Sequence, residues 1–71
     1  MMVNIYIDDE YIEGIDYGTS IENVSSGMYS MTTDSNGYVL YNDKYVLDSN
    51  GDRVLGSHSL YESTEYFTTE S

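Results

Sequence analysis

The feature that most restricts the fold of this chain is a turn signal repeated in its centre. Asp-Ser-Asn-Gly occurs twice, starting at Asp34 and Asp48, and Tyr-Val-Leu occurs twice, starting at Tyr38 and Tyr45. Asn-Gly between β-forming runs is the strongest short-range signal of a β-hairpin, because a two-residue type I′ turn needs positive φ at both central positions. We therefore predict a type I′ turn at each Asn-Gly pair. Asn42-Asp43, between the two Tyr-Val-Leu runs, is a third and weaker turn candidate.

Counting outward from these turns predicts the register of the strands, with Leu40 opposite Tyr45. One face of the sheet then holds the predicted core: Tyr29, Met31, Leu40, Tyr45, Leu47 and Val54. The other face is predicted to be mostly polar and to be crossed by an apolar strip: Val39, Val46 and Leu55. On that polar face Asp48 would lie opposite Arg53 and form a cross-strand ion pair.

The flanking segments predict three further elements. Residues 3–7 alternate as a strand does, and 11–18 follow an acidic turn, so we predict a second hairpin. Thr19 and Glu22 have the spacing of a capping box, which predicts a short helical turn near 20–25. Residues 59–68 are expected to form a last strand. The predicted fold is a single domain, residues 1–71. It is mainly β, α+β at most: a small antiparallel β-meander of hairpins with one short helical turn.

The charge of the chain works against folding. Thirteen Asp and Glu face two Lys and Arg, so the formal net charge is -11, and self-repulsion of this size opposes compaction while keeping a protein soluble and monomeric. High net charge with modest hydrophobicity is also the usual signature of disorder. Nine Tyr and a regular scatter of Ile, Val and Leu favour an ordered fold.

Several functional classes are not supported by the residues present. There is no Cys, and His58 is the only His, so neither a thiolate metal site nor a nucleophilic triad is indicated. The start of the chain lacks a basic n-region and a long apolar run, which favours a cytoplasmic protein without a signal peptide or membrane span. We expect no enzyme activity, no catalytic residue and no cofactor.

A calcium loop is the one metal motif that the sequence approaches. Residues 48–52 have the form D-x-N-x-D, but Arg53 stands where an EF-hand loop needs Gly, and Ser59 stands at the last ligand position. A hairpin turn explains the same residues, so we expect no metal site.

The acidic N-terminal segment is the candidate binding site. Residues 6–16 contain five carboxylates and no cation. Duplex DNA carries one charge per ~1.7 Å, so a net charge of eleven equals that of roughly 19 Å of duplex. Carboxylates could replace phosphates in a basic cleft, while interleaved tyrosines fill pockets that stack bases or Arg. The candidate partner-binding residues are Asp8, Asp9, Glu10, Tyr11, Glu13, Asp16, Tyr17 and Glu22, with Glu62, Glu65 and Glu70 as a C-terminal extension.

In size, acidity and lack of enzyme motifs, the chain resembles the small phage-encoded anti-CRISPR proteins, several of which mimic nucleic acid electrostatically. This resemblance implies an inhibitor that occupies the basic DNA- or RNA-binding surface of a CRISPR effector or another defence nuclease in the bacterial host cell. The expected partner is therefore a basic nucleic-acid-binding protein, with no direct binding of nucleic acid and no membrane.

Two other function classes stay open. Residues 44–56 resemble the aromatic β-hairpin repeat of choline-binding modules, which implies a ligand-binding hairpin, although this chain has no Trp and at most one and a half copies. A structural or assembly module is the other class, pairing with another chain or as a homodimer through β edges and the strip of Val39, Val46 and Leu55.

Overall fold

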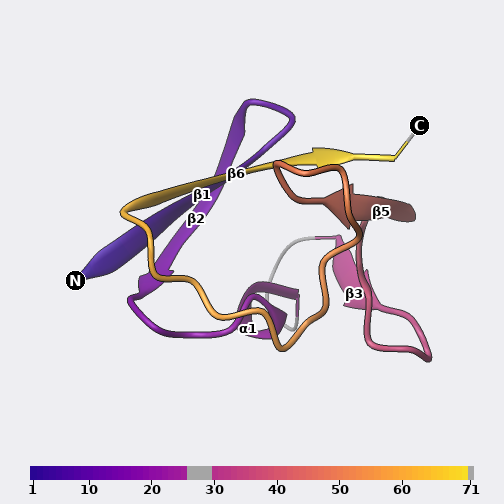
Figure 1. Ribbon diagram of the computed structural model, residues 1–71, viewed down its shortest axis with the longest axis horizontal. Coiled ribbons are helices and arrows are strands. Elements are labelled where there is room, and N and C mark those ends of the chain that lie inside the picture. The colour runs from indigo at the N-terminus through magenta and orange to yellow at the C-terminus, as the bar shows by residue number, and fades with distance from the viewer. Residues whose placement is uncertain (26–29, 71) are drawn as a thin grey trace.

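The computed structural model describes residues 1–25 and 30–70 and confirms a mainly β fold. These residues form one six-stranded sheet, in the order β2-β1-β6-β5-β4-β3, with one short helix; Figure 1 shows how the elements are arranged in space. The elements are β1 (Met2–Ile7), β2 (Glu10–Asp16), α1 (Glu22–Ser25), β3 (Met31–Thr33), β4 (Val39–Tyr41), β5 (Lys44–Leu47) and β6 (Thr64–Thr69). No helix among these described residues is long and apolar enough to cross a membrane.

The last strand joins the two hairpin systems. β6 pairs in parallel with β1 on one side and antiparallel with β5 on the other, so it runs between the N-terminal hairpin and the β3–β5 meander (Figure 1). The sequence predicted this strand but not its partners. A parallel pair forms between segments linked by a long crossover, and no local turn signal specifies it.

The N-terminal hairpin turns at Asp8 and Asp9, whose φ angles are 52° and 65°. Positive φ at both positions is the type I′ geometry, which Asp tolerates better than most residues. A bulge then shifts the register between Ile5 and Tyr6, leaving Ile12 as an extra residue in β2. Strict alternation would place Ile12 and Ile15 on opposite faces, whereas the bulge lets Ile12 be buried and Ile15 pack against the same core.

The two Asp-Ser-Asn-Gly turns form where predicted but are one residue longer than predicted. In the first, the Asp34 and Tyr38 backbones bond across a three-residue loop, and Asp34 Oδ1 accepts the N–H groups of Asn36 and Tyr38 at 2.9 Å each. Asp48 makes the same bonds to Asn50 and Asp52 in the second turn. Only the glycines have positive φ, at 87° and 83°. The type I′ prediction at these sites was wrong because the Asp carboxylate stabilises a longer loop.

Asn42-Asp43 is the central turn with type I′ geometry, since both φ angles are positive, at 51° and 65°. It sets the predicted pairing of Leu40 with Tyr45. The weakest of the three turn signals therefore gave the correct register.

The longer loops change which face of the meander is buried. A one-residue shift moves a strand's side chains to the opposite face, so Met31 and Val54 join Val39 and Val46 in the core. The predicted core members Leu40, Tyr45 and Leu47 are only half-buried, and Tyr29 lies outside the described residues. The predicted apolar strip does not exist as a surface, because Val39 and Val46 have no exposed area and only Leu55 is exposed.

The same shift overturns the predicted ion pair between Asp48 and Arg53. Arg53 lies opposite Leu47 instead. Its guanidinium reaches Glu70, with Nε 3.1 Å from Oε2. Loop length at the second turn thus determines which carboxylate Arg53 meets.

The core lies between the sheet and an irregular layer formed by α1 and the segment 53–60. Backbone bonds join this segment to 18–22 on one side and to 37–39 on the other. Ile21, Val24 and Leu60 from this layer are completely buried. The helical turn predicted near 20–25 is confirmed, with α1 spanning Glu22–Ser25 and contacting β3 and β4.

Candidate functional site

The structure places most of the predicted binding residues on one hairpin at the edge of the sheet. Asp8 and Asp9 form its turn, and β2 carries Glu10, Tyr11, Glu13 and Asp16. β2 is an edge strand, since β1 is its only neighbour in the sheet order. Tyr17 follows β2, whereas Glu22 lies in α1, next to Gly56 rather than on the hairpin.

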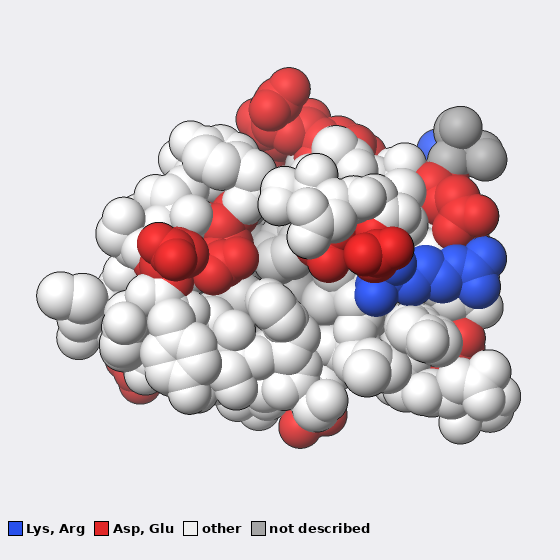
Figure 2. Space-filling model, in the orientation of Figure 1, with Lys and Arg blue, Asp and Glu red and all other residues white. Residues whose placement is uncertain are grey.

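The distribution of charge divides the molecule. The first cation in the sequence is Lys44 and the second is Arg53, so both belong to the meander and its following segment. Figure 2 shows the cationic atoms at one end of the visible face, while acidic groups are spread over it in separate patches. The half of the sheet built from β2, β1 and β6 therefore contains carboxylates and no Lys or Arg.

Asp8 has a structural role that the sequence did not reveal. Its carboxylate accepts the Thr69 N–H at 3.1 Å and the Thr69 hydroxyl at 2.7 Å. Its own N–H donates to the carbonyl of Phe67. These bonds fasten the hairpin turn to the end of β6, so Asp8 is less available to a partner than Asp9 and Glu10, which project from the same turn.

Three tyrosines stand side by side on the outer face of this half of the sheet, and we refer to Tyr11, Tyr6 and Tyr66 as the tyrosine row. Tyr6 pairs with Tyr11 on β2 and with Tyr66 on β6. The ring centroids lie 5.4 Å apart in the edge-on pair with Tyr11 and 5.2 Å apart in the stacked pair with Tyr66. Tyr11 was a predicted site residue. Tyr66 was missed, because the parallel pairing that brings it beside Tyr6 has no local signal.

Tyr17 belongs to a different surface. Its ring meets Tyr61 edge-on at a centroid distance of 5.4 Å. Both rings are about half exposed. The structure therefore separates Tyr17 from the tyrosine row, although the sequence placed both tyrosines in one candidate site.

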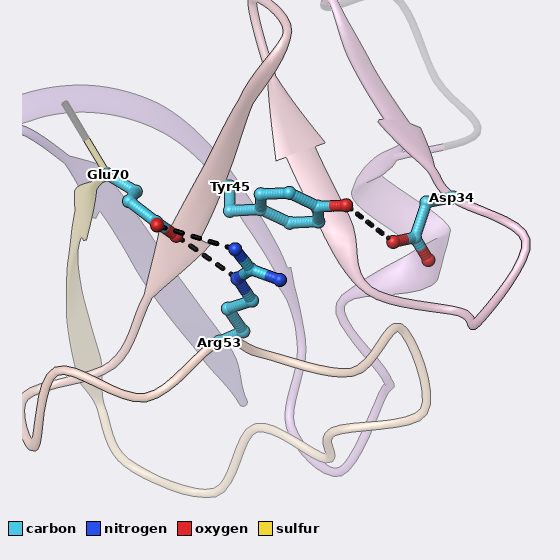
Figure 3. A network of polar contacts seen from close by, with 4 residues as sticks. All are labelled: Asp34, Tyr45, Arg53 and Glu70. Carbon is cyan, nitrogen blue, oxygen red and sulfur yellow. Dashed lines mark hydrogen bonds and ion pairs between the residues drawn. The ribbon is translucent and has the colours of Figure 1, made fainter.

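A polar network ties the meander to the C-terminal strand (Figure 3). The Tyr45 hydroxyl donates to Asp34 Oδ2 at 2.8 Å. Over the face of the same ring, the Arg53 guanidinium carbon lies 3.8 Å from the ring centroid, and Arg53 also pairs with Glu70. This network occupies Arg53, so that cation does not neutralise the acidic hairpin.

The network shifts three pKa values. The Tyr38 N–H and then the Tyr45 hydroxyl hold the pKa of Asp34 below its ordinary 3.8. The same bond, from the other side, raises the pKa of Tyr45 above its ordinary 10.0. The hydrogen bond to Glu70 raises the pKa of Arg53, which keeps the guanidinium charged.

These shifts predict a pH window for the network. Because the folded pKa of Asp34 is lowered, its contribution to stability is present above pH 3.8 and is lost as the pH falls through the folded value. Because the folded pKa of Tyr45 is raised, its contribution to stability is present below pH 10.0 and is lost as the pH rises through the folded value. Tyr45→Phe should therefore melt at a lower temperature than the wild type at neutral pH. Thermal unfolding across pH should show this difference shrinking at both extremes. A difference that stays constant with pH would contradict the assignment.

Two shallow cavities adjoin at Asp48 and His58. One cavity has a volume of about 290 Å³ and lies beside Tyr38 and Arg53, and the other has a volume of about 380 Å³ and lies beside β6. The His58 ring meets the Phe67 ring edge-on, with 6.3 Å between the ring centroids. Within residues 1–25 and 30–70, no group of three or more His, Asp or Glu side chains is placed to hold a metal ion.

No protein family model matches this sequence, and no curated protein or solved structure is significantly similar to it. Function therefore has to be inferred from the chain's own residues and their arrangement.

Proposed function

We propose that this chain is an acidic binding protein that inhibits a nucleic-acid-binding protein by occupying its basic DNA- or RNA-binding surface. In size and charge it resembles the anti-CRISPR proteins, and a CRISPR effector or another defence nuclease of a bacterial host is the proposed target. The contact surface is the β1–β2 hairpin, with Asp9, Glu10, Glu13 and Asp16 in the place of phosphates.

The observation that supports this proposal most is that one half of the sheet contains no Lys or Arg. β2 and β6 carry carboxylates, none of the strands β2, β1 and β6 carries a Lys or Arg, and Arg53 is paired with Glu70. The domain measures 30 × 21 × 20 Å. A net charge of eleven, equivalent to roughly 19 Å of duplex, is therefore carried by a body 20 to 30 Å across.

The first test is a capture experiment. The immobilised protein is exposed to nuclease-treated bacterial lysate at low and high salt, and retained proteins are identified by mass spectrometry. We expect one nucleic-acid-binding protein to be retained at low salt, because salt screens the charge attraction. Competing DNA or RNA should release it, because the nucleic acid binds the same basic surface. Indiscriminate retention of basic proteins, or release by salt alone without competition by nucleic acid, would contradict the proposal.

A matched pair of variants then locates the contact. Asp9→Asn/Glu10→Gln removes two charges from the hairpin turn, and Asp43→Asn/Asp52→Asn removes two charges from the meander. Asp9 and Asp43 both have a φ of 65°, and Asn tolerates that angle. We expect the hairpin variant to bind the retained protein about two- to thirtyfold more weakly, as for two exposed ion pairs. Equal weakening by both variants would show that net charge acts without the hairpin surface.

A further inference from the structure

The tyrosine row is oriented away from the core. Tyr6 alternates along β1 with Ile5 and Ile7, which are buried, so its ring lies on the opposite face of the sheet. Side chains paired across neighbouring strands share a face, and this places Tyr11 and Tyr66 there too. The row spans three strands and joins the hairpin to β6.

Both ends of the row are open to solvent. Tyr11 is 54% exposed and Tyr66 is 63% exposed. Tyr is enriched at binding hot spots because it offers a large, rigid area with a polar tip. A row of rings at this exposure presents its π faces and edges to whatever contacts the sheet.

Carboxylates flank the row at both ends. Asp9 and Glu10 precede Tyr11 in the sequence, Asp9 in the hairpin turn and Glu10 on β2 opposite Ile7. Tyr66 itself lines the cavity of about 380 Å³, together with Asp48, Glu62 and Glu65 and with no Lys or Arg, although Glu65 pairs with Ile5 and so points to the other face of the sheet. The surroundings of the row are therefore complementary to a cation, most closely at the cavity beside Tyr66.

The molecule already contains one example of the contact that such surroundings favour. The Arg53 guanidinium lies over the Tyr45 ring at 3.8 Å and donates to Glu70 from Nε at 3.1 Å (Figure 3). An aromatic face and a carboxylate thus hold one guanidinium together. The tyrosine row repeats these two components without an internal cation.

We propose that the tyrosine row is a docking surface for arginine side chains of the basic partner. A guanidinium lies flat over an exposed ring, most directly Tyr66, while its N–H groups donate to a neighbouring carboxylate. Arginine is specified over lysine, because a planar guanidinium stacks on a ring and bonds a carboxylate at the same time, whereas an ammonium is a compact, strongly hydrated charge. This inference rests on the proposed function and adds to it the residue type that the partner must present.

The test uses two probes of equal length and charge, an oligoarginine and an oligolysine peptide. Their affinities for the full-length protein are measured by isothermal titration calorimetry at low salt. Tyr66→Leu keeps an apolar side chain and removes the aromatic face. Tyr61→Leu is the matched control, because Tyr61 is 56% exposed and paired with Tyr17 outside the row. Circular dichroism and thermal unfolding establish that both variants fold.

We expect the wild type to prefer oligoarginine and Tyr66→Leu to bind it about two- to fivefold more weakly, as for one exposed cation–π contact. Tyr66→Phe should keep the preference, and Tyr61→Leu should bind as the wild type does. Equal affinity for both peptides, or equal losses in Tyr66→Leu and Tyr61→Leu, would overturn the role of the row and leave the proposed acidic inhibitor standing. Failure of both peptides to bind at low salt would overturn both proposals.

Discussion

Replacing Ile5 with Ala is expected to remove about 2 to 5 kcal/mol from the free energy of unfolding, through lost burial and the cavity left behind. Ile5 has no exposed area and lies in β1 between β2 and β6. A domain of this length has a total stability of only about 4 to 11 kcal/mol. Urea denaturation at neutral pH should therefore show a large fall in the midpoint, or a chain that is already partly unfolded without urea.

Leu55→Ala is the control for this prediction. It deletes the same number of carbon atoms from a side chain that is 45% exposed and is expected to cost less than about 1 kcal/mol. The comparison also tests the register, because the sequence placed Leu55 with Val39 and Val46 whereas the structure buries the two valines without it. Equal costs for the two substitutions would contradict the described core.

Asp8→Ala is expected to destabilise the protein by about 2 to 3 kcal/mol, although it removes one of many repelling charges. The variant loses two hydrogen bonds from Thr69, and it places Ala at a φ of 52°, where an L residue without a polar side chain is strained. The free energy of unfolding from urea titration measures this cost.

Two neighbouring variants separate the causes. Asp8→Asn keeps a carbonyl acceptor and tolerates positive φ, so it should lose less than half as much stability as Asp8→Ala. Glu10→Ala removes the same charge from an exposed strand position and should be neutral or slightly stabilising, because self-repulsion is relieved. If Glu10→Ala is as destabilising as Asp8→Ala, the bonds to Thr69 do not fasten the hairpin.

The dual position of Asp8 affects how the binding proposal is tested. Neutralising the whole turn with Ala would confound loss of a binding charge with loss of a structural bond. The binding test therefore substitutes Asp9 and Glu10 with the isosteric amides Asn and Gln, which preserve the turn. A binding defect in that variant then reports on the surface and leaves the fold unchanged.

The turns and strands of this protein follow from short segments of its sequence. Asp-Ser-Asn-Gly and Asn42-Asp43 turn the chain because Asp, Asn and Gly bond their own backbone or accept positive φ, and the runs between them are β-forming. The acidic hairpin could be located in the same way, since its carboxylates are contiguous in sequence. Local chemistry was sufficient for each of these predictions.

The exact register and the grouping of tyrosines depend on contacts across the whole fold. Two- and three-residue loops are both compatible with Asp-Ser-Asn-Gly, and the longer one prevails where the Asp carboxylate accepts two N–H groups and Met31 and Val54 become buried beside Val39 and Val46. β6 reaches β1 through parallel pairing that only the assembled core stabilises. Tyr66 lies beside Tyr6 for that reason alone. The sequence by itself determined the turns, the strands and the charge. Tertiary packing determined which distant side chains became neighbours, because the burial of apolar surface stabilises contacts that no local segment can specify.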